Sequence, residues 1–169
     1  MKKILYVPNP ILRQKAKTIK NITSKEIDIS KKMIDMMLKA PGVGLAANQI
    51  GVLKKIVTVN IKSPEDNDNI YVLFNPKISF YSKNKIIMEE GCLSLPQQYA
   101  EIERSEEIIV EYQNEKNERI EQKKIGFEAR VLQHEIDHLH GKLFVDYLSS
   151  LKRNILIKKV KKLEKMGEI

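Results

Sequence analysis

The apolar residues near the start of the chain follow a helical period. Between positions 24 and 40 they recur at the three- and four-residue spacing that places them on one helix face: Ile27, Ile34, Met37 and Leu38. Pro41 and Gly42 are typical of the end of a helix. The pattern predicts one amphipathic helix over 24–40, preceded by a short turn or helix that opens at Asn9 and Pro10.

The middle of the chain is rich in β-branched and aromatic residues, which favour strands. Segments of this kind lie at 53–61, 70–81, 85–90, 106–114 and 117–125. The last two flank a polar turn and predict a hairpin, whereas the run of turn formers at 62–69 predicts a surface loop.

The helical period returns after Gly126, where Phe127, Val131, His134 and His138 share one face. Gly141 is a natural end for this helix. A final amphipathic helix is predicted over 148–166, with lysines on its outer face. A helix, several strands and two further helices indicate an α+β fold with an antiparallel or mixed sheet.

Composition narrows the class of protein. A chain of 169 residues, 42% hydrophobic and 31% charged, is ordinary for a globular protein, and we expect a single domain over 1–169. No apolar run approaches the ~18 residues that cross a bilayer, so no membrane partner is expected. The apolar stretch near the N-terminus ends at Pro8 and is too short for a signal peptide, which predicts a cytoplasmic location.

Positive charge is concentrated at the C-terminus. The net charge is +8, and residues 152–169 hold seven of the 30 Lys and Arg residues but two of the 22 acidic ones. This asymmetry favours an acidic or nucleic-acid-containing partner for the tail, although exposed lysines also commonly form no more than a solvated helix face.

The segment HEIDH at 134–138 carries the strongest chemical signal. Residues four apart lie on one side of a helix, so His134 and His138 can bind one metal ion, and Glu135 can act as a general base. The alternative is a polar helix face with two partly exposed histidines. A catalytic zinc-type site needs a third protein ligand.

The only cysteine, Cys92 in EGCLS, is one candidate for that ligand, because thiolates bind such metals strongly. A buried, inert cysteine is the alternative. The downstream acids Asp146, Glu164 and Glu168 remain open as ligands, whereas His140 is expected on the surface. The string GVGLAANQ at 42–49 lacks the features of a phosphate loop; it allows close backbone approach to a ligand, with Gln49 as an amide donor, or simply compact packing.

GVGLAANQ, EGCLS and QHEIDH, in this order and at these separations, resemble the three signature motifs of the peptide deformylases. The likeness runs from NPILR at 9–13 through KLFVDYL at 142–148 to the basic last helix, so it covers essentially the whole chain. It implies antiparallel or mixed sheets packed around a central HExxH helix, with an N-terminal helix and a basic C-terminal helix.

The resemblance also implies a role for each motif residue. Cys92, His134 and His138 would bind the metal, with water in the fourth position. Glu135 would be general base and then acid, while Gln49 and the backbone N–H of Leu93 would stabilise the oxyanion. The expected substrate-binding residues, most of them around a methionine side chain, are Val43, Gly44, Met88, Glu90, Gly91, Phe127, Arg130 and Val131.

Three further expectations concern neighbouring side chains. The stem of Arg130 should line the pocket while its head reaches outward, and Glu128 should face solvent. Asp137 and Arg104 should form an ion pair that steadies the metal-binding helix.

The implied activity is removal of the formyl group from N-formylmethionyl peptides, in which metal-bound water attacks the formyl carbon. The resemblance implies one divalent metal ion, Fe²⁺ foremost, with Zn²⁺, Ni²⁺ or Co²⁺ able to bind. It also supports ribosome docking by the basic tail, without sequence-specific binding of nucleic acid. Two rivals remain at this stage: a zincin-like endopeptidase, and a non-enzymatic ribosome- or RNA-binding protein.

Overall fold

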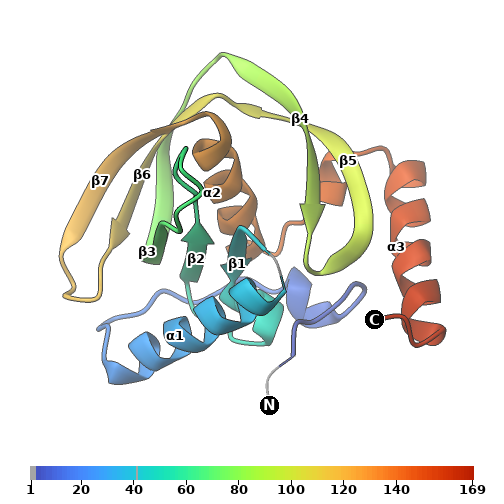
Figure 1. Ribbon diagram of the computed structural model, residues 1–169, viewed down its shortest axis with the longest axis horizontal. Helices are drawn as coiled ribbons and strands as arrows, with labels where there is room; N and C mark the ends of the chain where they lie inside the picture. Colours follow the sequence, from blue (N-terminus) through green and yellow to red (C-terminus); the bar gives the residue numbers. More distant parts are fainter. Residues whose placement is uncertain (1–2, 41) are drawn as a thin grey trace.

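The computed structural model describes residues 3–40 and 42–169. The fold is α+β, as predicted (Figure 1). The strands β1 (Gly44–Ala46), β2 (Ile56–Asn60), β3 (Ile70–Tyr81), β6 (Glu107–Gln113) and β7 (Arg119–Ile125) form one sheet in the order β1-β2-β3-β6-β7. The strands β4 (Lys85–Cys92) and β5 (Leu95–Ser105) form a separate two-stranded sheet. All pairs of these strands are antiparallel.

Three α-helices and three short 3₁₀ helices complete the fold. The α-helices are α1 (Ser24–Lys39), α2 (Gly126–Leu139) and α3 (Ser150–Lys165), and the 3₁₀ helices are η1 (Pro10–Arg13), η2 (Ala47–Ile50) and η3 (Phe144–Tyr147). Helix α2 runs through the middle of the molecule between the two sheets, and α3 lies on the far side of β5 (Figure 1). No helix of the described residues has the length and apolar character needed to cross a membrane.

Local sequence explains where α1 begins and ends. Thr23 caps its N-terminus, and the Thr23 backbone N–H donates a hydrogen bond to Glu26 Oε2 in a capping box. The helix ends at Lys39, close to the predicted boundary, and Pro41 lies outside the described residues. The buried side chains Met33 and Met37 pack into a hydrophobic cluster that includes Leu45 of β1. This packing holds β1 against α1.

Helix α2 is buried on nearly every side, because both sheets pack against it. Ala129, Val131, Leu132, Ile136 and Leu139 join a cluster with residues of β1, β2, β3 and β6. Polar residues of α2 are buried too, among them Gln133, His134, Glu135 and His138. Buried polar groups on a core helix are costly unless they are paired or bind a ligand, so this face marks a functional site.

Most strands were predicted, but β1 and β5 were not. Strand β1 has three residues, too few for a periodic signal, and it is stabilised by pairing of Gly44 with Val59 and Ala46 with Val57. Strand β5 has the polar sequence LPQQYAEIERS, and its pairing with β4 and the burial of Leu95 and Ile102 stabilise it. The sequence therefore did not show that Cys92 lies at the end of β4, next to the turn into β5.

Candidate metal centre

The three side chains proposed as ligands meet at the edge of α2. His134 and His138 lie one helical turn apart, with ring centroids separated by 5.1 Å. Cys92 ends β4, and its Sγ lies 3.3 Å from Nε2 of His138. One ligand atom from each of Cys92, His134 and His138 lies within 4.8 Å of the other two. Within the described residues, no other His, Cys, Asp or Glu group of three or more meets this criterion.

The donor set fits a divalent transition metal. The Nδ1 of His134 lies 2.9 Å from Oε2 of Glu90, so this bond leaves Nε2 available for a cation. Burial lowers the pKa of His138, which favours the neutral imidazole that metals bind. One sulfur and two imidazole nitrogens are characteristic ligands of such ions. The downstream acid Asp146 pairs instead with Arg13 at 2.5 Å.

Glu90 is the centre of a buried ion-pair network. Arg104 donates to it from Nε at 2.5 Å and from Nη2 at 3.0 Å, and Arg130 donates from Nη1 at 2.6 Å. Burial alone would raise the pKa of Glu90, but hydrogen bonds from His134 and Arg104 outweigh it and lower the pKa to about 2. Glu90 is therefore a carboxylate at neutral pH, and it orients His134.

Two expectations about α2 side chains are wrong. The head of Arg130 does not reach outward: it is buried, with Nη2 donating to the Ile86 carbonyl at 2.5 Å and Nη1 to the Ile102 carbonyl at 2.9 Å. The attraction of Glu90 explains this inward turn. Glu128 is partly buried, because Tyr71 and Lys124 both donate to its Oε1.

The predicted pair between Arg104 and Asp137 is present, with Nη1 at 2.9 Å from Oδ2. Tyr147 of η3 also donates to Asp137 Oδ2, at 2.7 Å. This hydroxyl contact was not predicted. The pair joins α2 to β5, and it fixes the helix turn that carries both histidines. His140 is exposed, as expected.

Glu135 is buried beside the ligand set. Burial raises its pKa to about 7, and its Oε2 has no hydrogen-bond partner among the described residues. A Cβ on Gly44 would lie 2.7 Å from Glu135 Cγ, so only glycine allows β1 to pass this close. A carboxyl group with such a pKa and a free oxygen can both accept and return a proton near neutral pH.

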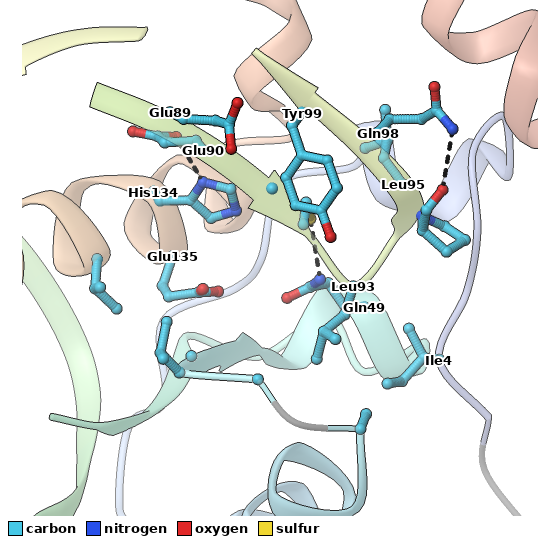
Figure 2. A pocket seen from close by; sticks show the side chains of 18 of the residues that line it. Ile4, Gln49, Glu89, Glu90, Leu93, Leu95, Gln98, Tyr99, His134 and Glu135 are labelled. Carbon is cyan, nitrogen blue, oxygen red and sulfur yellow. Dashed lines mark hydrogen bonds and ion pairs between the residues drawn. The ribbon is translucent and has the colours of Figure 1, made fainter. Parts of the chain in front are cut away.

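The amide of Gln49 is held in one orientation. Its Oε1 accepts a hydrogen bond from the Ala46 N–H at 2.9 Å, so Nε2 points to Ser94 Oγ at 3.0 Å and to Cys92 Sγ at 3.5 Å. Figure 2 shows this amide across the cavity from His134 and Glu135. Ser94, which was not singled out from the sequence, lies two residues after Cys92 in the same motif.

A cavity of about 530 Å³ opens beside these groups. Of the eleven predicted catalytic and substrate-binding residues, those that line it are Val43, Gly44, Gln49, Glu90, Gly91, Leu93, Phe127, Arg130, Val131 and Glu135. Met88 does not line it, and its side chain is 38% exposed. The cavity also includes residues that the sequence did not identify, such as Ile4 and Tyr6 from the N-terminal segment.

The sequence and the fold of this chain are similar to those of known proteins. Residues 1–154 match the family model described as polypeptide deformylase. A peptide deformylase of Pelagibacter ubique is 45% identical over 166 residues, which cover 97% of this chain and 95% of that protein. The crystal structure of peptide deformylase from Ehrlichia chaffeensis has 35% identity and a TM-score of 0.94, covering 100% of this chain and 99% of that one.

A peptide deformylase structure from Acinetobacter baumannii with Met-Ala-Ser bound has 31% identity and a TM-score of 0.82, and the match covers 88% of this chain and 98% of that one. The agreement extends over sequence and fold together, which neither the endopeptidase nor the non-enzymatic interpretation explains. The chain belongs to the polypeptide deformylase family, hydrolases that remove the N-formyl group from newly made peptides.

Proposed function

We propose that the cavity binds the formylmethionyl end of a peptide and presents its formamide bond to Cys92, His134, His138 and Glu135. The convergence of the three ligand atoms, all within 4.8 Å of one another, carries this proposal. They lie beside a cavity large enough for a methionine side chain and the adjoining backbone, about 530 Å³. The buried carboxyl of Glu135 lies beside the same cavity.

The metal site consists of Cys92 Sγ and one ring nitrogen each of His134 and His138. These three side chains would hold a divalent cation, which would supply the Lewis acidity that polarises the formyl carbonyl and activates water. We infer Fe²⁺ as the native ion from the family resemblance, and the same donors also accept Zn²⁺, Ni²⁺ and Co²⁺. Metal analysis of protein purified without oxygen tests this: stoichiometric iron supports it, and stoichiometric zinc contradicts it.

Glu135 moves the proton. It takes a proton from the water that attacks the formyl carbon and then returns it to the leaving amine, so that formate and a free amino terminus are released. Its pKa of about 7, raised by burial, suits both halves of this transfer. Gly44 leaves room for this side chain, because any Cβ there would collide with it.

Gln49 and the backbone N–H of Leu93 stabilise the negative charge that develops on the formyl oxygen. The amide of Gln49 is already oriented by Ala46 and Ser94, so little reorganisation accompanies the reaction. A preorganised donor of this kind typically contributes about 2.7–4 kcal/mol to transition-state stabilisation.

Strand β1 aligns the peptide. It lies at the edge of the five-stranded sheet and pairs only with β2 among the described strands, so its second edge can take an extended peptide as an added strand. The Met-Ala-Ser complex of the Acinetobacter baumannii protein supports a peptide in this cavity. Around the methionine side chain we place Val43, Gly91, Phe127, Val131 and the buried stem of Arg130.

The decisive assay measures formate release from formyl-Met-Ala-Ser together with the metal content of the protein. Formate release at a rate that requires the bound metal supports the proposal. Cleavage of an internal bond in the unformylated peptide, without formate release, would instead indicate an endopeptidase. The Cys92→Ala variant distinguishes loss of metal from loss of folding. We expect a folded protein with little metal and little activity.

We also infer that α3 docks on the ribosome. Lys158, Lys159, Lys161 and Lys162 are exposed on α3, and such a surface attracts RNA phosphates. Changing these four lysines to Gln retains the buried contact of Val160, which a truncation would remove. Loss of salt-sensitive co-sedimentation with ribosomes supports docking, and unchanged co-sedimentation contradicts it. This role and the substrate both imply a cytoplasmic location.

A further inference from the structure

Residues of β5 and α3 line a second hollow of about 370 Å³. Figure 1 shows α3 on the side of β5 away from β4. We call this hollow the β5–α3 groove. Its lining residues are Tyr99, Ala100 and Glu101 from β5, and Leu148, Lys152, Ile155 and Leu156 from α3 and the residues just before it. None of these residues is a proposed metal ligand or a catalytic group of the formyl reaction.

The groove leaves apolar surface in contact with water. Ile155 is 44% exposed and Tyr99 is 61% exposed, although both side chains are large and apolar in their main part. The two charged lining residues, Glu101 and Lys152, carry opposite charges, so the groove has no net charge. An uncharged, partly apolar groove favours apolar side chains over charged ones.

Tyr99 connects this groove with the active cavity, because it lines both. Its ring lies over Gly91: a Cβ on Gly91 would be 2.6 Å from Tyr99 Cε1. Gly91 pairs with Tyr99 across the β4–β5 ladder and immediately precedes the ligand Cys92. Figure 2 shows the Tyr99 ring among the side chains that line the active cavity. Glu101, in the groove, lies two residues further along β5, a step of roughly 6.6 Å.

We propose that the β5–α3 groove binds the part of the substrate peptide that follows its third residue and that it favours apolar side chains there. The inference rests on the proposed function, since it requires the formylated end to be bound in the active cavity. An extended peptide advances by about 3.3 Å per residue, so a chain that leaves the cavity over Tyr99 reaches the groove within two or three residues. Tyr99 lines both the groove and the active cavity, so the two adjoin at this side chain.

The test compares three formylated peptides: formyl-Met-Ala-Ser, the same peptide extended by Leu-Leu-Phe, and the same peptide extended by Ser-Gly-Ser. We expect kcat/KM for the apolar six-residue peptide to exceed that for the polar one by about tenfold, which corresponds to ~1.4 kcal/mol. Burial of roughly 55 Å² of apolar surface is sufficient for this effect.

Two variants of α3 test whether the preference for the apolar six-residue peptide arises in the groove. Ile155→Glu places a carboxylate in the groove, whereas Leu151→Glu places one on the same helix at a side chain that is 70% exposed and does not line the groove. We expect Ile155→Glu to bring the ratio of the two six-residue peptides close to one and Leu151→Glu to retain it. The three-residue peptide should react equally well with both variants, which shows that folding and the active site are intact.

Other results overturn the inference. A ratio near one in the unaltered protein, or a ratio that survives Ile155→Glu, shows that the groove does not contact the substrate. Light scattering that reveals a dimer of the unaltered protein and a monomer of Ile155→Glu assigns the groove to a second copy of the chain. Failure to release formate from the three-residue peptide would contradict the proposed function itself. That result is distinct from a failure of the groove proposal, which concerns only the two six-residue peptides.

Discussion

The Nδ1 atom of His134 lies 2.9 Å from Oε2 of Glu90, and the same carboxylate accepts hydrogen bonds from Arg104 and Arg130. One acidic side chain therefore orients a metal ligand and pairs with two buried guanidinium groups, of which Arg104 also pairs with Asp137. Strand β4 places Glu90 two residues before Cys92, so the cysteine ligand and the partner of the histidine ligand come from the same strand. Folding of β4 against α2 completes the metal centre.

Replacing Glu90 with Gln should weaken both the fold and the metal site. The substitution leaves Arg104 and Arg130 buried without their shared counter-charge, and loss of one partner of a buried ion pair typically costs about 3–5 kcal/mol. Metal affinity should fall by roughly 10- to 100-fold, because His134 loses its orienting partner. Urea unfolding and metal titration measure the two effects. Glu89→Gln, at the exposed neighbouring position, serves as the control and should change neither.

Replacing Glu135 with Gln should leave the metal bound but remove proton transfer. We expect kcat to fall by about 10²- to 10⁴-fold with little change in metal content, since Glu135 is not one of the three ligands. Metal analysis and formate release on the same sample measure this. A variant that keeps the rate of the unaltered protein would refute the role assigned to Glu135.

The sequence anticipates that Cys92, His134 and His138 lie close together, because the two histidines have a helical spacing and the family resemblance adds the cysteine. Two histidines four residues apart need only a helix to converge, and the motifs around Cys92 and Gln49 supply the rest. The position of Arg130 had no such signal. Its spacing from His134 places it near the pocket, but the direction of its head depends on Glu90, a residue 40 positions away.

The same limit explains the residues and strands that were missed. Glu128 was expected to face solvent because of its angular position on the helix. Instead it accepts a hydrogen bond from the hydroxyl of Tyr71 in β3, a residue 57 positions earlier in the chain. Met88 shares strand β4 with Glu90, yet its side chain remains outside the cavity. Strand β5 is polar in sequence because only part of one face meets the core. Long-range pairing determines each of these features, and periodicity carries no information about it.

Replacing Gly44 with Ala should damage catalysis more than stability. A Cβ there would lie 2.7 Å from Glu135 Cγ, so the Glu135 side chain must move while the backbone pairing of β1 can remain. A displacement of this size in a catalytic group can reduce kcat by about 10²-fold. Gly167→Ala is a control for kcat at the C-terminal end: a Cβ there meets no atom within 4 Å, and the positive φ of 71° strains only the local backbone. Equal kcat values for the two variants would show that the space beside Glu135 is unimportant.

Stability should fall in acid through Glu26, far from the metal centre. Hydrogen bonds from Lys54, at 2.5 Å, and from Thr23 lower the pKa of Glu26 to about 2, against the opposing effect of burial. A carboxyl group whose pKa is lowered by folding stabilises the folded state above its unfolded pKa, near 4.5, and this contribution is lost as the pH falls toward 2.

Glu26→Gln should therefore destabilise the protein by about 1 kcal/mol at pH 7, since it removes the charge that binds Lys54 and weakens the helix cap. The difference from the unaltered protein should shrink between pH 5 and pH 2, because the unaltered side chain then becomes protonated as well. Urea unfolding at several pH values measures this convergence. Asp35→Asn, at an exposed position of the same helix, should produce a much smaller difference at every pH. A Glu26→Gln effect of constant size from pH 7 to pH 3 would show that the side chain acts through packing and not through its charge.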